Sequence, residues 1–200
     1  MSFFFGFASR SQQHLGLLDS RNTLLSFLGT AQLLSVDLLP ITWNPALKDV
    51  GAGGMATLHE RSISRNLSLV FKRVDPNNFP HYTEKATEDM VYRTLAAEIA
   101  TARHYEVVES DYLAHLEGVC WDIERGGKVW PVLVYEKARY GSLKSIVESP
   151  QIVAPTTLDV TAKLRICTHI ARGLATLHHS AIVHGDIKPD NVIIFEDKKG

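Results

Sequence analysis

Short apolar runs separated by turns that contain glycine or proline dominate the first two thirds of the chain and predict β-strands. The expected strands cover residues 46–50, 57–60, 67–74, 116–123 and 129–135. Gly126 and Gly127 separate the last two strands, which we expect to form a hairpin. This part of the chain therefore predicts a β-sheet.

Two longer segments have apolar residues at helical spacing. The first covers residues 88–107. The second is expected to begin at Thr156, with Asp159 as a weak capping box, and to end near His179. Its apolar stripe consists of Val160, Leu164, Cys167, Ala171, Leu174 and Leu177. We expect short strands at 181–183 and 192–195, on either side of a polar turn.

The first 40 residues carry no recognisable chemistry. Leu24, Leu25 and Leu28 have helical spacing, so we expect a short helical extension that packs on the following domain. Pro40 and Pro45 interrupt the chain before the first expected strand.

The composition is that of a globular protein, with 45% hydrophobic and 22% charged residues. Lys and Arg number 21 against 22 Asp and Glu, so charge favours neither nucleic acid nor a membrane surface as a partner. Cys120 and Cys167 are too few for a disulfide framework or a zinc site, which favours a reducing compartment. Residues 2–7 are apolar but lack a basic leader, so we expect no signal peptide and an intracellular, cytoplasmic protein.

The strongest chemical signal is the polar turn His184-Gly185-Asp186-Ile187-Lys188-Pro189-Asp190-Asn191. It places a carboxylate, an ammonium group and a carboxamide within six residues. A carboxylate can take a proton from a hydroxyl, a lysine can neutralise a phosphoryl oxygen, and an asparagine oxygen can bind a divalent metal. The alternative is a polar surface turn of chance composition.

The whole string resembles the catalytic loop of eukaryotic-type protein kinases, H-x-D-x-K-P-x-N, in its usual place after a long helix. The resemblance implies that Asp186 orients and deprotonates the substrate hydroxyl, Lys188 stabilises the transferred phosphoryl group and Asn191 holds Mg2+. The position of Lys188 is typical of Ser/Thr kinases. Gly185 replaces an arginine that pairs with a phosphorylated activation loop in many kinases, so we expect no such gating here.

The segment Gly51-Ala52-Gly53-Gly54-Met55-Ala56-Thr57-Leu58 resembles the glycine-rich loop of the same family. Glycines there let backbone N–H groups approach nucleotide phosphates, because no Cβ intervenes. The resemblance implies that Gly51, Gly53, Gly54 and Leu58 contact ATP. Ala56 replaces the usual third glycine, and Leu58 replaces the usual valine.

Lys72 lies on the third expected strand among apolar neighbours. One interpretation is that its aliphatic stem packs at the edge of the sheet while its ammonium group reaches solvent. The number of residues between the glycine loop and Lys72 resembles instead the spacing in kinases, where a lysine at this position contacts the α- and β-phosphates of ATP. Val70 then lines the adenine pocket, in place of a smaller alanine.

Glu98 is the carboxylate that we expect to pair with Lys72. It follows Leu95 by three positions and so lies on the apolar face of the expected helix, where an unpaired carboxylate is unfavourable. Glu88 and Glu106 remain alternatives that helical spacing does not exclude.

The segment 132–138 resembles the kinase hinge, with Tyr135 at the gatekeeper position. The resemblance implies that main-chain groups of Glu136 and Ala138 bind the adenine ring. Gly141-Ser142-Leu143 is expected to open the next short helix.

The order of elements predicts an α+β fold, and the resemblance implies a protein-kinase-like arrangement. We expect an N-terminal extension (1–40), an N-lobe of antiparallel sheet with one helix (41–136), and a hinge with the beginning of a mainly helical C-lobe (137–200). The resemblance ends near residue 195, before the Asp-Phe-Gly segment whose aspartate is the main magnesium ligand. The apolar stripe of the second helix should therefore be partly exposed.

Two functions follow from the resemblance. The first is an ATP- and Mg2+-dependent Ser/Thr protein kinase, of unidentified protein substrate and incomplete in this chain. The alternative is an inactive kinase-like module that binds nucleotide or another protein.

Overall fold

The computed structural model describes residues 22–42, 48–52, 56–62, 68–76, 83–124, 126–148 and 159–195; between 42 and 68 it describes only the backbone. These residues form two compact units. The sheet unit contains the described residues up to Arg103 together with Leu116–Glu136, and the helical unit contains His104–His115 and the residues from Lys137 onward. No helix within the described ranges is long and apolar enough to cross a membrane.

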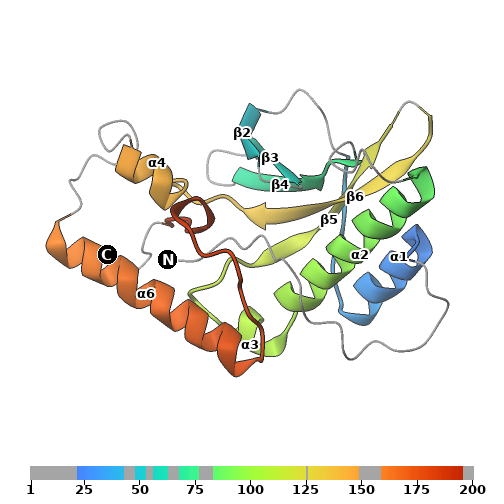
Figure 1. The fold of residues 1–200 in the computed structure, drawn as a ribbon. Helices are drawn as coiled ribbons and strands as arrows, with labels where there is room; N and C mark the ends of the chain where they lie inside the picture. The colour runs from blue at the N-terminus through green and yellow to red at the C-terminus, as the bar shows by residue number, and fades with distance from the viewer. Residues whose placement is uncertain are drawn as a thin grey trace. The chain divides into compact units, whose positions relative to one another are not determined.

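The sheet unit is built on a six-stranded sheet of order β1-β5-β6-β4-β3-β2 (Figure 1). The strands are β1 (Leu38–Thr42), β2 (Lys48–Ala52), β3 (Ala56–Ser62), β4 (Ser68–Val74), β5 (Leu116–Ile123) and β6 (Val129–Glu136). All neighbours are antiparallel except β1 and β5. The structure confirms the five expected strands and adds β1, which the sequence did not predict because of Pro40. Proline is tolerated in β1 because β1 lies at the edge of the sheet.

The two faces of the central strand β4 differ in chemistry. Leu69 and Phe71 are buried with Cys120, Val132 and Val134 in an apolar cluster. Lys72, which is also buried, projects from the other face because successive side chains alternate along a strand. Burial raises the pKa of the Cys120 thiol to about 12, so this cysteine is a packing residue and not a reactive one.

Two helices pack on one another in the sheet unit (Figure 1). Helix α1 (Leu24–Leu33) confirms the expected helical extension and buries Phe27 and Ala31. Helix α2 (Glu84–Ala102) begins after Thr83, whose hydroxyl accepts a hydrogen bond from the amide of Ala86.

The expected single helix over 88–107 is wrong at both ends. Helix α2 begins four residues earlier, at its Thr83 cap, and ends at Ala102. His104 has extended backbone angles, and a separate short helix, α3 (Tyr105–Val108), follows it in the helical unit. Apolar spacing continues across the break, which is why the sequence did not reveal it.

The helical unit is organised around α6 (Val160–His179), which Asp159 precedes as the N-terminal cap. The Asp159 carboxylate accepts a 2.7 Å hydrogen bond from the amide of Ala162, so Asp159 is the cap, and Thr156 lies outside the described residues. Seven buried residues form the core of this unit: Val107, Leu113, Ile146, Ile166, Leu177, Val192 and Ile194. The expected partial exposure of the apolar stripe is confirmed, because Val160 and Leu164 are exposed whereas Leu177 is buried.

The two strands expected around the polar turn do not form. Residues 181–183 are irregular, and 192–195 make only an isolated bridge between Ser142 and Ile193. The backbone of 192–194 instead bonds to the segment that leads into α4 (Leu143–Glu148), with Leu143 N–H donating to Val192 O at 2.7 Å. The turn itself contains a 3-10 helix, η2 (Pro189–Asn191).

Candidate functional site

A buried ion pair joins β4 to α2 in the sheet unit. Lys72 Nζ lies 2.7 Å from both carboxylate oxygens of Glu98, and the two residues are only 7% and 3% exposed. Because each buried charge would be strongly unfavourable alone, the pair holds the helix against the strand.

The two alternative partners of Lys72 have other contacts. Glu88 is paired with Lys128 at 2.8 Å. Glu106 lies in α3, in the helical unit, and accepts a hydrogen bond from the hydroxyl of Ser180. The structure therefore confirms Glu98, the expected partner of Lys72, over the two alternatives.

Tyr135 is a third member of the buried cluster. Its hydroxyl donates a 2.8 Å hydrogen bond to Glu98 Oε1. Burial, followed by the negative charge of Glu98, raises the pKa of Tyr135 well above its usual value, so the phenol keeps its proton and remains a donor. The sequence placed Tyr135 next to the expected nucleotide pocket but did not reveal this contact. The β4–β6 ladder explains it, because Val70 lies opposite Tyr135, two residues from Lys72.

The structure describes part of the expected nucleotide-binding segment. Gly51 lies in β2 and Leu58 in β3, where Leu58 is opposite Lys72 in the ladder. Val70, on β4, is partly buried. Gly53 and Gly54 lie outside the described residues, so their expected contact with phosphates stays a prediction.

The expected hinge residues fall at a unit boundary. Glu136 is the last residue of β6 and pairs with Leu69, in the sheet unit. Ala138 is buried in the helical unit, and its carbonyl accepts a hydrogen bond from the amide of Gly141. Their expected contacts with adenine also stay predictions.

The polar turn of the helical unit brings its three chemical groups together. Lys188 Nζ lies 2.8 Å from Asp186 Oδ2. The Asn191 amide nitrogen donates to the backbone oxygen of Asp186 at 2.7 Å and to its Oδ2 at 3.0 Å. The hydrogen bond from Lys188, and next that from Asn191, lower the pKa of Asp186, which is therefore ionised at neutral pH.

His184 is the buried residue of this turn. Its Nδ1 accepts a 3.0 Å hydrogen bond from the amide of Asp186, and the residue is 1% exposed. Burial lowers the pKa of His184 to about 4, so the ring is neutral at physiological pH and can accept this bond. The sequence showed His184 as part of the motif but did not reveal this supporting contact.

Gly185 has a positive φ of 75°, a backbone conformation that glycine adopts without strain. A side chain here would meet no neighbouring atom, so the constraint comes from the backbone and not from space. An arginine at this position would therefore be strained in the observed backbone conformation. The absence of gating by activation-loop phosphorylation stays a prediction.

The possible metal ligands in this turn suit a metal ion that is held mainly by the phosphates of a substrate. Among the described residues there is no group of three or more His, Cys, Asp or Glu that could hold a metal ion. The amide nitrogen of Asn191 is engaged by Asp186, so its amide oxygen is the atom that could ligate a metal. Mg2+ commonly takes one or two protein ligands and completes its shell with phosphate oxygens and water, which fits this arrangement.

The curated relatives include plant kinases. PTI1-like tyrosine-protein kinase 1 of Arabidopsis thaliana is 26% identical over 157 residues, which are 75% of this chain and 39% of that protein. The LRR receptor-like serine/threonine-protein kinase RGI2 of the same plant is 28% identical over 154 residues, 74% of this chain and 12% of that protein. The chain thus spans well under half the length of these relatives.

Solved structures share the fold. The pseudokinase DRIK1 bound to ENMD-2076 has a TM-score of 0.56 at 18% identity, covering 74% of this chain and 52% of that chain. The maize SIRK1 kinase domain bound to AMP-PNP has a TM-score of 0.54 at 18% identity, covering 80% of this chain and 52% of that chain. These likenesses confirm the expected kinase-like α+β fold. Residues 46–199 match the family model described as "Protein kinase domain", and the chain belongs to that eukaryotic-type protein kinase family.

Proposed function

We propose that this kinase domain binds ATP with Mg2+ and transfers the γ-phosphoryl group to a Ser or Thr hydroxyl of a protein. The observation that carries the proposal is the turn in which Lys188 and Asn191 both lie within hydrogen-bonding distance of the Asp186 carboxylate. A carboxylate with a lowered pKa, an ammonium group and an amide oxygen are the groups that this transfer needs.

Each residue has a role in this proposal. Asp186 orients the substrate hydroxyl and takes its proton, and Lys188 neutralises charge on the transferred group. Asn191 would hold Mg2+, which supplies charge neutralisation at the phosphates. In the sheet unit Lys72, held by Glu98, would contact the α- and β-phosphates. The AMP-PNP in the maize SIRK1 structure supports nucleotide binding by a domain of this fold.

The choice of Ser or Thr as acceptor rests on the position of Lys188 in the turn. The relatives include proteins named as serine/threonine kinases and as tyrosine kinases, so their names do not decide the acceptor. Phosphoamino-acid analysis of a labelled acceptor protein decides it. The two unpaired thiols, Cys120 and Cys167, support a reducing intracellular location.

A transfer assay with radiolabelled Mg-ATP and a generic acceptor protein tests the activity. Asp186→Asn should reduce transfer by about 10²-fold or more, because the proton acceptor is lost. Lys144→Ala is the matched control: Lys144 forms an exposed ion pair with Asp190 of the same turn, and its loss should leave transfer unchanged. Equal transfer by wild type and Asp186→Asn would place the activity elsewhere.

The inactive binding module remains the second candidate, and the same protein distinguishes it. DRIK1 is a pseudokinase with this fold, so the fold alone does not establish transfer. A thermal-shift titration should show Mg-ATP raising the melting temperature of the wild type but not of Lys72→Ala. If Mg-ATP raises the melting temperature but no phosphoryl transfer is detected, the protein is a nucleotide-binding module. If Mg-ATP does not change the melting temperature, neither the kinase nor the nucleotide-binding module is supported.

A further inference from the structure

Residues 22–42, here called the N-terminal strap, connect the helix that carries Glu98 to the sheet that carries Lys72. The strap consists of α1, a four-residue turn and β1. At its second end β1 adds a parallel edge strand to β5, and the carbonyl of Asp37 accepts a 2.8 Å hydrogen bond from the amide of Val119. The approach is close: a Cβ at Gly118 would lie 2.5 Å from the carbonyl oxygen of Asp37.

The first end of the strap contacts α2 through polar and aromatic groups. Asp89 Oδ1 accepts hydrogen bonds from the backbone amide of Asn22 at 2.6 Å and from its side-chain nitrogen at 3.2 Å. Phe27 is 1% exposed, and its ring centroid lies 6.5 Å from that of Tyr92 on α2. The Tyr92 ring also stacks on Trp130 of β6, with ring centroids 5.8 Å apart, so the aromatic contact continues from the strap through α2 into the sheet.

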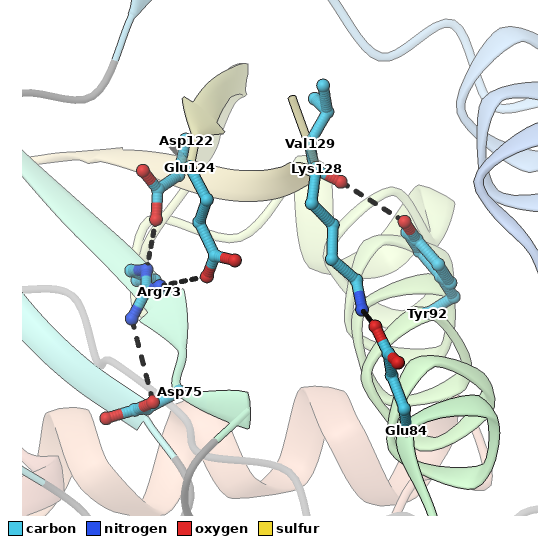
Figure 2. A network of polar contacts seen from close by, with 8 residues as sticks. All are labelled: Arg73, Asp75, Glu84, Tyr92, Asp122, Glu124, Lys128 and Val129. Atoms are coloured by element: carbon cyan, nitrogen blue, oxygen red, sulfur yellow. Dashed lines mark hydrogen bonds and ion pairs between the residues drawn. The ribbon is translucent and has the colours of Figure 1, made fainter. Parts of the chain in front are cut away.

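The β5–β6 hairpin holds the same end of α2 (Figure 2). Lys128 is paired with Glu84 at 2.8 Å, as Figure 2 shows, and also with Glu88 at 2.8 Å. The Tyr92 hydroxyl donates to the carbonyl of Val129 at 3.2 Å. The strap therefore contacts the same half of α2 that is bound to the β5–β6 hairpin.

Strand β4 is tied to β5, the strand with which the strap pairs. Arg73, next to Lys72, forms ion pairs with Asp122 of β5, with Glu124 and with Asp75 (Figure 2). A continuous set of contacts thus runs from the strap through β5 and Arg73 to Lys72.

Helix α2 can transmit the position of its first half to Glu98. Asp89 and Tyr92 precede Glu98 by nine and six residues in one uninterrupted helix, or roughly 9–14 Å along its axis. A helix of this length moves as a body, whereas the Lys72–Glu98 hydrogen bonds require distances of 2.7 Å. A displacement of α2 at the strap contact would therefore lengthen the distances on which the pair depends.

We propose that the N-terminal strap is a positioning device that holds α2 where Glu98 pairs with Lys72, and that release of the strap separates the pair. The consequence for phosphoryl transfer rests on the proposed function. The positioning itself does not, because it can be measured on the protein without nucleotide.

The direct measurement is the acylation rate of the Lys72 amine, quantified by mass spectrometry under native conditions. Lys72 is buried in its pair, whereas Lys85, on the same helix α2, is exposed and serves as the internal reference. Phe27→Ala should raise the labelling of Lys72 by about tenfold relative to Lys85, a typical coupling between sites. Amide hydrogen exchange should rise in α2 but not in β4 and β6.

Two matched variants separate positioning from general loss of stability. Leu25→Ala removes an exposed side chain of α1 and should leave Lys72 labelling unchanged. Phe27→Leu keeps an apolar side chain at the contact and should restore most of the protection. No change in Lys72 labelling in Phe27→Ala, or an equal rise in exchange throughout the sheet, would overturn the proposal.

A milder variant keeps the test decisive if Phe27→Ala does not fold. Asp89→Ala removes both hydrogen bonds from Asn22 without opening a cavity. It should raise Lys72 labelling in the same direction by a smaller factor, and unchanged labelling in this folded variant would equally overturn the proposal. Because no arm contains ATP, failure of the proposed kinase activity leaves these outcomes unaffected.

Discussion

The two charged clusters of this chain are built in opposite ways. In the sheet unit, Lys72, Glu98 and Tyr135 come from positions 26 and 37 residues apart and are buried together. In the helical unit, Asp186, Lys188 and Asn191 lie within six residues and remain accessible to solvent. The first cluster depends on the packing of a helix on a sheet, whereas the second depends on the local shape of one turn.

This difference predicts unequal contributions of the two clusters to stability. Removing one member of a buried pair leaves the other charge without compensation, so the sheet-unit cluster should contribute strongly to stability. Exposed ion pairs contribute little, so the turn can hold reactive groups with little consequence for folding. The following changes test that contrast, from the largest expected effect on stability to the smallest.

Glu98→Ala should lower the free energy of unfolding of the sheet unit by about 3–5 kcal/mol, because it leaves the Lys72 ammonium group buried and unpaired. Denaturant unfolding followed by tryptophan fluorescence measures this, because Trp121 on β5 and Trp130 on β6 both lie in the sheet unit. The double variant Lys72→Met with Glu98→Leu should recover most of the loss. A loss below about 1 kcal/mol in Glu98→Ala would contradict the buried pair.

Acidification should destabilise the helical unit through His184. Its pKa is about 4 in the folded protein against 6.5 for the unperturbed group, so between these values the unfolded chain binds more protons. The contribution of the neutral His184 to stability is therefore fully present above pH 6.5 and is lost as the pH decreases towards 4, by about 3 kcal/mol in total. Circular dichroism unfolding curves at several pH values, compared with His184→Asn, measure this. An identical pH dependence in the variant would exclude His184 as the cause.

Tyr135→Phe should lower the free energy of unfolding by about 1–2 kcal/mol, because Glu98 loses one hydrogen-bond donor but keeps Lys72. Tyr105→Phe is the matched control, since Tyr105 is exposed, and should have no measurable effect. Tryptophan fluorescence during denaturation distinguishes the two variants. Equal stabilities would mean that the hydroxyl contact contributes nothing to the cluster.

Lys188→Ala should leave the unfolding curve of the helical unit unchanged, because its ion pair with Asp186 is exposed to solvent. The pKa of Asp186 should rise towards its ordinary value, since the hydrogen bond from Lys188 is the largest cause of its lowering. NMR titration of the Asp186 carboxyl carbon measures that change. A marked loss of stability would show that the turn, too, depends on its charges for folding.

The sequence predicted the polar turn well because its contacts are local. The order and spacing of Asp186, Lys188 and Asn191 are sufficient to bring them together once the chain turns, and the motif is specific to one family. Periodicity likewise placed Glu98 on the buried face of its helix, because 3.6 residues per turn is a property of the backbone. The prediction of strands at 181–183 and 192–195 was wrong, because an apolar run of three or four residues does not reveal whether a neighbouring strand is present to pair with it.

Tertiary structure decided the features that depend on distant segments. The sequence favoured Glu98 as the partner of Lys72 but could not exclude Glu88 and Glu106, because that exclusion depends on how α2 lies against β4. It also could not show that Pro40 belongs to an edge strand, or that the Tyr135 hydroxyl reaches Glu98. Local sequence determines which groups a segment presents, whereas the packing of segments far apart in the chain determines which of those groups meet.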